Sequence, residues 1–212
     1  MCLAILVLGG GCGRREEGRV PAPVVAVEDW SIEPGARLGS VPWEGSEQEL
    51  IRAFGAANVR DTLIAMGEGE TAPGAIVYPD DPQRRVEIVW GDPGAKRNLS
   101  RVILRGDRSK WTLPPGISLG TSLRELEEKN GRPFRMTGFG WDYAGAVISW
   151  QGGALDSALT PGVHIYLMPR PEHRAGPEYS RLQGDREVPS SLPGMQGLNP
   201  RVYQVFVDGS ML

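Results

Sequence analysis

Apolar and polar residues alternate in several short runs of this chain, and two short stretches with helical spacing interrupt them. The two helices are predicted at 47–54 and 123–130, where apolar residues recur on one face. Period-two alternation predicts strands at 75–78, 86–90, 99–104, 134–139, 144–150, 163–168 and 201–208. The pattern therefore predicts an α+β fold with antiparallel strands.

Each predicted helix has its own start and stop signals. A serine followed three residues later by a glutamate forms a capping box, and a glycine nine residues after the serine suits the turn that ends the helix. These residues are Ser46, Glu49 and Gly55 in the first helix and Ser122, Glu125 and Gly131 in the second.

The segments 34–40 and 115–121, just before the two helices, share the pattern P-G-x-x-L-G-[ST], which indicates an internal repeat. We therefore expect two tandem units, 31–113 and 114–168. Each would be a helix followed by an antiparallel three-strand meander, and the two sheets would pair or pack together. Residues 169–212 would add a long loop and a final strand.

The loop at 169–200 is rich in proline, glycine and charge and has no periodicity. A connection of this length without secondary structure is unusual inside a compact domain. Two interpretations stay open: a surface crossover that returns the last strand to the sheet, and a loop that binds a partner.

The amino-acid composition of the chain excludes several classes of function. The 212 residues include 29 glycines and 18 prolines, which favours many turns, and the net charge is −3. Without a positive charge excess, binding to nucleic acid or to an anionic membrane surface is not expected. The chain has only two histidines, and both of its cysteines lie within the first twelve residues. We therefore predict no metal and no cofactor.

The first twelve residues combine an apolar run at 2–8, three glycines and Cys12. The run is too short to span a bilayer but fits the apolar region of a secretory signal peptide. The spacing of these glycines excludes the G-x-G-x-x-G turn of a dinucleotide-binding fold, because Arg14 or Glu16 stands where the last glycine would be needed.

A cysteine directly after small residues resembles the lipobox of bacterial lipoproteins. The resemblance implies that 1–11 is a removed signal peptide, that the thiol of Cys12 is acylated, and that 12–30 is a tether. It implies a lipid-anchored protein of the bacterial cell envelope that faces the periplasm. Its contact with the membrane would be through acylated Cys12 alone.

The tandem arrangement resembles the fold of β-lactamase inhibitory proteins and of small outer-membrane assembly lipoproteins. The block 130–134 and its continuation at 138–143 also look like a stretch found in uncharacterised exported bacterial proteins. The resemblance implies a protein-binding or scaffolding role, with an envelope protein as partner. The resemblance of the fold rests on Gly35, Leu38, Gly39, Glu49 and Leu50 in the first unit and on Gly116, Leu119, Gly120, Glu125 and Leu126 in the second.

Four aromatic residues, Phe139, Trp141, Tyr143 and Trp150, are the candidate partner contacts, since aromatic side chains dominate binding hot spots. In a strand, the first three would share one face. That face would either be a contact surface or pack under the helix near 122–130.

Other polar residues carry little chemistry. We interpret Asp80 and Asp81 as part of an ordinary turn and Glu127 and Glu128 as part of a solvated helix face. His164 and His173 are interpreted as isolated histidines. We found no nucleophile elbow, phosphate loop or C-x-x-C motif. The sequence favours a non-catalytic role; the alternative is an envelope hydrolase whose site is assembled from distant carboxylates, including Asp142, with Tyr143.

Overall fold

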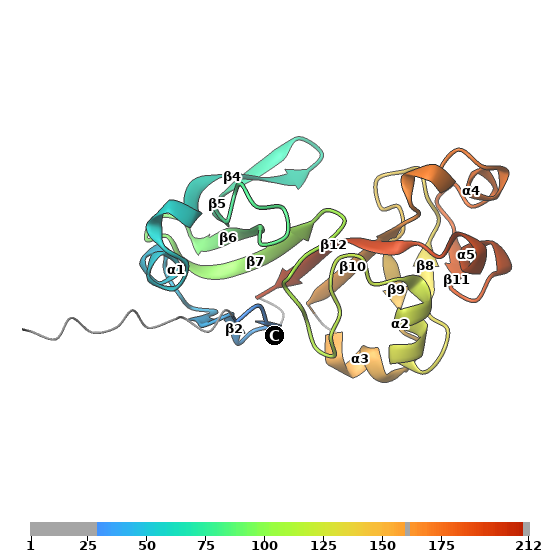
Figure 1. Ribbon diagram of the computed structural model, residues 1–212, viewed down its shortest axis with the longest axis horizontal. Helices are drawn as coiled ribbons and strands as arrows, with labels where there is room; N and C mark the ends of the chain where they lie inside the picture. The colour runs from blue at the N-terminus through green and yellow to red at the C-terminus, as the bar shows by residue number, and fades with distance from the viewer. Residues whose placement is uncertain (1–28, 160–161, 210–212) are drawn as a thin grey trace, which may run out of the picture.

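The computed structural model describes residues 29–159 and 162–209. It is a mixed α+β fold with three antiparallel sheets and five α-helices among these residues (Figure 1). The helices are α1 (Glu47–Phe54), α2 (Leu123–Asn130), α3 (Ala154–Leu159), α4 (Pro177–Arg181) and α5 (Pro193–Leu198), with 3-10 turns η1 (Ala56–Asn58) and η2 (Pro171–His173).

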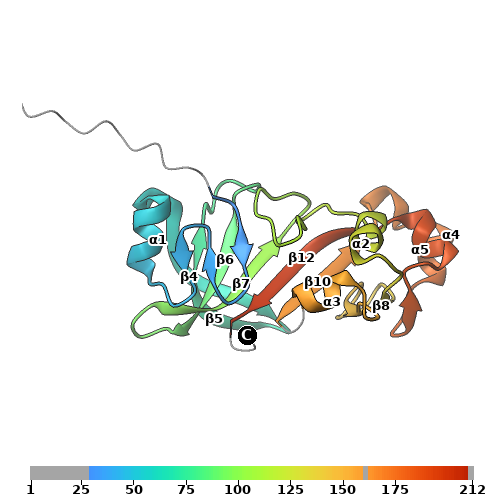
Figure 2. The same ribbon diagram turned by 90° about the horizontal axis from the view of Figure 1, so that it is seen from below.

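A six-stranded antiparallel sheet forms the centre of the molecule, in the order β10-β12-β7-β6-β5-β4. Its strands are β4 (Val59–Gly67), β5 (Glu70–Val77), β6 (Val86–Asp92), β7 (Arg97–Arg105), β10 (Val163–Met168) and β12 (Arg201–Asp208). The last strand, β12, lies between β7 and β10, so that Val205 pairs with Leu104 on one side and Ile165 on the other. It thereby joins the two ends of the molecule (Figures 1 and 2).

Two small sheets flank the large one. The first has the strands β1 (Ile32–Glu33), β2 (Arg37–Leu38) and β3 (Val41–Pro42). The second has the order β11-β8-β9, with β8 (Arg135–Thr137), β9 (Val147–Ser149) and β11 (Glu187–Pro189).

The main core lies on one face of the large sheet and continues under the helices of both ends. Trp111 is fully buried there, and its Nε1 donates to the carbonyl oxygen of Arg84 at 2.7 Å. The rings of Trp30 and Phe54 meet Trp111 edge-on, with centroids 5.0 and 5.8 Å away. Trp30, the last residue of the expected tether, therefore belongs to the folded body.

Both predicted helices are confirmed, with the expected bounds and both capping boxes. Ser122 N–H donates to Glu125 Oε2 at 2.8 Å, and Glu125 N–H donates back to Ser122 Oγ at 3.3 Å. Gly131 takes the left-handed conformation that ends α2. Gly55 has positive φ but an extended ψ of 142°, because the chain turns directly into η1.

The short strands β1, β2, β3 and β11 were not predicted, and the two expected meanders each need a correction. Four strands follow α1, because β4 was not predicted. After α2, β10 does not continue a meander with β8 and β9 but joins the large sheet, because β12 pairs with it. The final strand is confirmed at Arg201–Asp208.

The loop 169–200 is not without structure. It contains η2, α4, β11 and α5, and β11 pairs with β8 as the third strand of its sheet. Part of it is therefore a structural component of the α2 end of the molecule.

Candidate functional site

The large sheet has a second face, here called the open face, opposite the main core. On β12, Val205 and Val207 point to the main core, whereas Phe206 points to the open face. There it packs against a small separate cluster that includes Ile64, Val89 and Ile103. One row of open-face residues runs in register across all six strands: His164, Phe206, Ile103, Glu87, Ile76 and Arg60.

Two buried carboxylates organise the charges of this face. The side chains of Glu87 and Asp208 are each only 8% exposed. Glu87 accepts from Arg85 Nη2 at 2.9 Å and also from Arg105. Because carboxylates are costly to bury unpaired, these two arginines offset the cost of placing Glu87 within the sheet.

The negative charge of Asp208 is likewise balanced by a neighbouring arginine. It accepts a hydrogen bond from Arg101, and His164 Nε2 lies 3.2 Å from its Oδ2. The guanidinium of Arg101 also lies 5.4 Å from the centre of the Phe206 ring. Such contacts fix long side chains in one position, so this part of the open face is preorganised.

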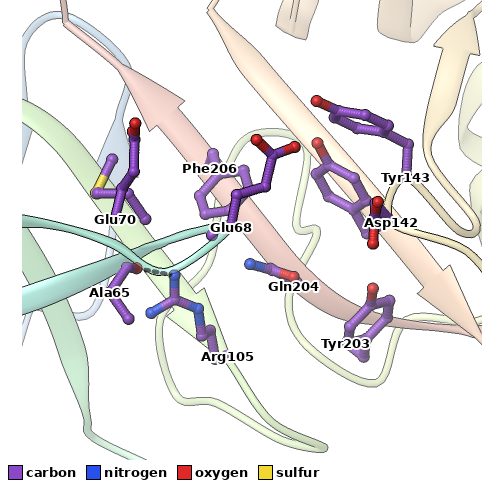
Figure 3. Close-up of a pocket in the computed structure, with 12 residues that line it drawn as sticks. Ala65, Glu68, Glu70, Arg105, Asp142, Tyr143, Tyr203, Gln204 and Phe206 are labelled. Carbon is purple, nitrogen blue, oxygen red and sulfur yellow. Dashed lines mark hydrogen bonds between the residues drawn. The ribbon is translucent and has the colours of Figure 1, made fainter.

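Beside these pairs the open face is hollowed into a cavity of about 700 Å³, here called the acidic hollow. Its wall on one side is the β4–β5 hairpin tip, which carries Glu68 and Glu70, and on the other the turn with Asp142 and Tyr143 (Figure 3). Its floor is formed by Arg105, Tyr166, Tyr203, Gln204 and Phe206.

The three wall carboxylates make no ion pair among the described residues, whereas Arg105 is neutralised by Glu87. The hollow is therefore net acidic. Its floor is aromatic: the rings of Tyr166 and Phe206 meet edge to face, with centroids 5.5 Å apart. Burial raises the pKa of the Tyr166 and Tyr203 hydroxyls, so both stay protonated donors at neutral pH.

Close packing positions the turn that carries Tyr143. Leu167 N–H on β10 donates to the carbonyl oxygen of Gly145 at 2.8 Å. A Cβ at Gly145, where φ is +72°, would stand 1.8 Å from the Leu167 carbonyl oxygen, so only glycine fits. Thr137 Oγ1 donates to the Tyr143 carbonyl oxygen at 2.6 Å and ties the same turn to β8.

A search of known protein families, characterised proteins and solved structures found no match to this chain. The site is therefore interpreted from its own residues.

The four candidate contact residues do not share one surface. Phe139 and Trp150 are 0% and 4% exposed and belong to the main core, so they cannot contact a partner. Tyr143 is 53% exposed and lines the acidic hollow. The expected common strand face is wrong, because residues 141–145 form a turn after β8 rather than a strand.

Trp141 has an intermediate position. It is half-buried, and its ring meets Tyr143 with centroids 5.6 Å apart. Its indole nitrogen is buried without a hydrogen-bond partner among the described residues. Trp141 therefore packs against the Tyr143 ring.

The remaining polar candidates have structural positions. Asp81 forms a turn by accepting from the backbone N–H groups of Gln83 and Arg84. Glu127 is not a solvated residue, since it accepts from the buried Ser190 hydroxyl and from Gln196 Nε2 at 2.7 Å. No group of three or more metal-ligating side chains occurs in the part of the chain that the structure describes.

Cys12 and the expected signal peptide at 1–11 lie outside the described residues, as does most of the tether at 12–30. None of the helices within the described ranges is long and apolar enough to cross a membrane.

Sequence reasoning missed the floor of the hollow. Tyr166 and Phe206 alternate with core residues in two strands that were predicted, so their exposure on a second face could have been read from the alternation. The pairing of β12 with β7 and β10 brings Arg105 beside these two rings. No local sequence pattern predicts that pairing.

Proposed function

We propose that this protein is a non-catalytic binding protein of the bacterial cell envelope, which holds a basic segment of another protein in the acidic hollow. The observation that carries the proposal is the combination of three unpaired carboxylates with an aromatic floor on a preorganised sheet face. Tyrosine, phenylalanine and arginine are typical of interface centres, and unpaired carboxylates select a cationic partner.

The partner proposal is tested by co-purification from envelope extract with tagged full-length chain. Asp142→Asn with Tyr143→Ala removes one wall of the hollow, and Ile148→Ser is the control because Ile148 is 48% exposed and lies outside it. A specific protein should be recovered with wild type and the control and lost with the double variant. Equal recovery with all three would contradict the proposal.

We further propose that the protein is anchored through acylated Cys12, with residues 1–11 removed and 12–30 as tether. The support is the sequence pattern at the chain start. Labelled palmitate should enter wild type and Cys2→Ser but not Cys12→Ser. Equal labelling of Cys12→Ser, or no labelling of wild type, would refute the anchor.

The expected tandem repeat also remains a proposal, now limited to the turn and helix of each unit. It is supported by the matched positive φ of Gly35 and Gly116 (70° and 79°) and of Gly39 and Gly120 (55° and 88°). The resemblance to β-lactamase inhibitory proteins and to outer-membrane assembly lipoproteins is proposed on the same residues.

One observation favours the second candidate, an envelope hydrolase: Glu68, Glu70 and Asp142 line one hollow. All three are exposed, however, whereas a catalytic carboxylic acid is normally kept protonated by burial. Release of soluble fragments from purified peptidoglycan by wild type, and its loss in Asp142→Asn, would establish this candidate instead.

A further inference from the structure

A second hollow of about 480 Å³ adjoins the acidic one, and its charge is opposite. Four arginines line it: Arg108, Arg170, Arg174 and Arg201. Two acidic residues, Asp107 and Glu172, also line it, which leaves the lining net basic. It is here called the basic hollow.

Three of these arginines, Arg108, Arg174 and Arg201, make no ion pair among the described residues. Arg201 Nη1 donates to the Gly120 carbonyl oxygen at 2.7 Å, and Arg174 Nε donates to that of Pro169 at 2.8 Å. Both guanidinium groups are thus fixed by neutral backbone acceptors. Among the described residues Arg108 has no ion pair, and Arg170 approaches Glu172 only at 4.0 Å.

The arginines of the open face differ in this respect. Arg101 and Arg105 are neutralised by the buried carboxylates Asp208 and Glu87. A fold that pairs arginines on one part of the sheet and leaves a cluster unpaired beside it presents a local positive potential.

The two hollows follow one another along the same strands. Residues 201–203 of β12 line the basic hollow, Tyr203, Gln204 and Phe206 line the acidic one, and Tyr203 therefore lines both. Since a strand rises about 3.3 Å per residue, the parts of β12 that line the two hollows lie about 7–10 Å apart, the span of two to three residues of extended chain.

We propose that the basic hollow binds the acidic side chains of the same polypeptide segment whose basic side chains occupy the acidic hollow. This inference rests on the proposed function and adds a requirement for both charges in the ligand. Glu68, Glu70 and Asp142 next to the basic hollow repel a continuous polyanion, so a nucleic acid or an anionic membrane surface is a poorer fit than a chain of mixed charge.

The test uses three capped peptides and the full chain. Two bipolar peptides, Lys-Lys-Ser-Gly-Glu-Glu and its reverse, cover both directions of binding, and Lys-Lys-Ser-Gly-Ser-Ser lacks the acidic block. Affinity is measured from amide chemical shifts at low salt. One bipolar peptide should bind about fivefold more tightly than the lysine-only peptide, as expected for a partly exposed ion pair.

Charge-removing variants locate the effect. Arg108→Gln with Arg170→Gln should abolish the difference between the bipolar and lysine-only peptides. The lysine-only peptide should bind this variant no more weakly than wild type, because removing nearby positive charge does not weaken the binding of a cation. Arg52→Gln on α1, whose side chain is 73% exposed and outside both hollows, is the matched control and should preserve the difference. Unchanged spectra away from the hollows verify that each variant folds.

The outcomes separate the two proposals. Equal binding of bipolar and lysine-only peptides overturns the further inference and leaves the acidic hollow as a site for basic segments. Failure of every peptide to bind overturns both. Inorganic phosphate and phosphatidylglycerol vesicles are tested at Arg108 and Arg170 in the same way. If either binds more tightly than the bipolar peptide, the assignment of a polypeptide ligand is overturned. Binding of phosphate would then indicate a free anion as the ligand, and binding of vesicles a lipid headgroup.

Discussion

Arg105 on β7 and Glu87 on β6 form an ion pair on the open face of the large sheet, and the Glu87 side chain is only 8% exposed. The same guanidinium donates to the Ala65 carbonyl oxygen at 2.7 Å, at the base of the β4–β5 hairpin tip. One arginine therefore connects a buried carboxylate to the wall of the acidic hollow.

The first prediction concerns this connection. Glu87→Gln leaves Arg85 and Arg105 without their counter-charge, and both are about one-third exposed, so water can solvate them in part. We expect a loss of about 1–3 kcal/mol in the free energy of unfolding, measured by urea denaturation.

The control is Glu187→Gln, because Glu187 is 49% exposed and, within the described part of the chain, forms an ion pair with Arg135 alone. It should change the free energy of unfolding by less than about 0.5 kcal/mol. Equal effects of the two variants would show that the Glu87 ion pairs contribute no more than a surface pair.

The second prediction concerns the turn that carries Tyr143. Gly145 and Gly131 have nearly the same φ, 72° and 74°, but a Cβ meets the Leu167 backbone only at Gly145. Gly131→Ala should cost about 1–2 kcal/mol for the left-handed conformation alone. Gly145→Ala should cost about 1–3 kcal/mol more, because the turn must move away from β10.

The stability difference is measured by urea denaturation, and the movement by the chemical shifts of the Tyr143 ring. Gly145→Ala should shift these resonances and Gly131→Ala should not. If both variants lose the same stability, the contact of the turn with Leu167 does not restrain it.

The third prediction is a pH dependence from the helix caps. The pKa of Glu125 is lowered, chiefly by the hydrogen bond from the Ser122 hydroxyl and then by the Ser122 backbone N–H. The pKa of Glu49 is lowered in the same way by Ser46. Because the folded-state pKa is the lower one, this stabilisation is present above the unfolded value of about 4.3 and is lost as pH falls through the folded value.

Urea denaturation at pH 6 and pH 3 measures the effect. Glu125→Gln should reduce the stability lost between these two pH values, whereas Glu128→Gln, at an exposed neighbouring position on α2, should leave the loss as in wild type. An unchanged pH dependence in Glu125→Gln would argue that the cap does not couple folding to proton binding.

Local patterns were sufficient for α1, α2 and β12, whereas the short helices α3, α4 and α5 were not predicted. The capping boxes fixed α1 and α2, and clean alternation fixed Arg201–Asp208. The strand β4 was missed because Arg60, Asp61 and Thr62 interrupt its alternation, and as an edge strand it has a neighbour on only one side.

The site depends on pairing between strands that are distant in the sequence, and the spacing of residues along the chain does not predict such pairing. Tyr143 was proposed from its residue type, and it does line the acidic hollow. Phe139 was proposed on the same grounds, but it stacks on Tyr179 in the core, at a centroid distance of 5.5 Å, because α4 packs over it. The burial of Phe139 therefore depends on a segment that was expected to lack secondary structure.

The binding role of the acidic hollow is tested most directly by photocrosslinking in cells that express the full chain. A photoreactive phenylalanine derivative replaces Tyr143 in the hollow or, as the control, Ile148, which is exposed outside it. The account predicts a discrete crosslinked protein from position 143 that is absent from position 148 and disappears when Glu68→Gln and Asp142→Asn are added. The same adduct from both positions, or none from position 143, would contradict it.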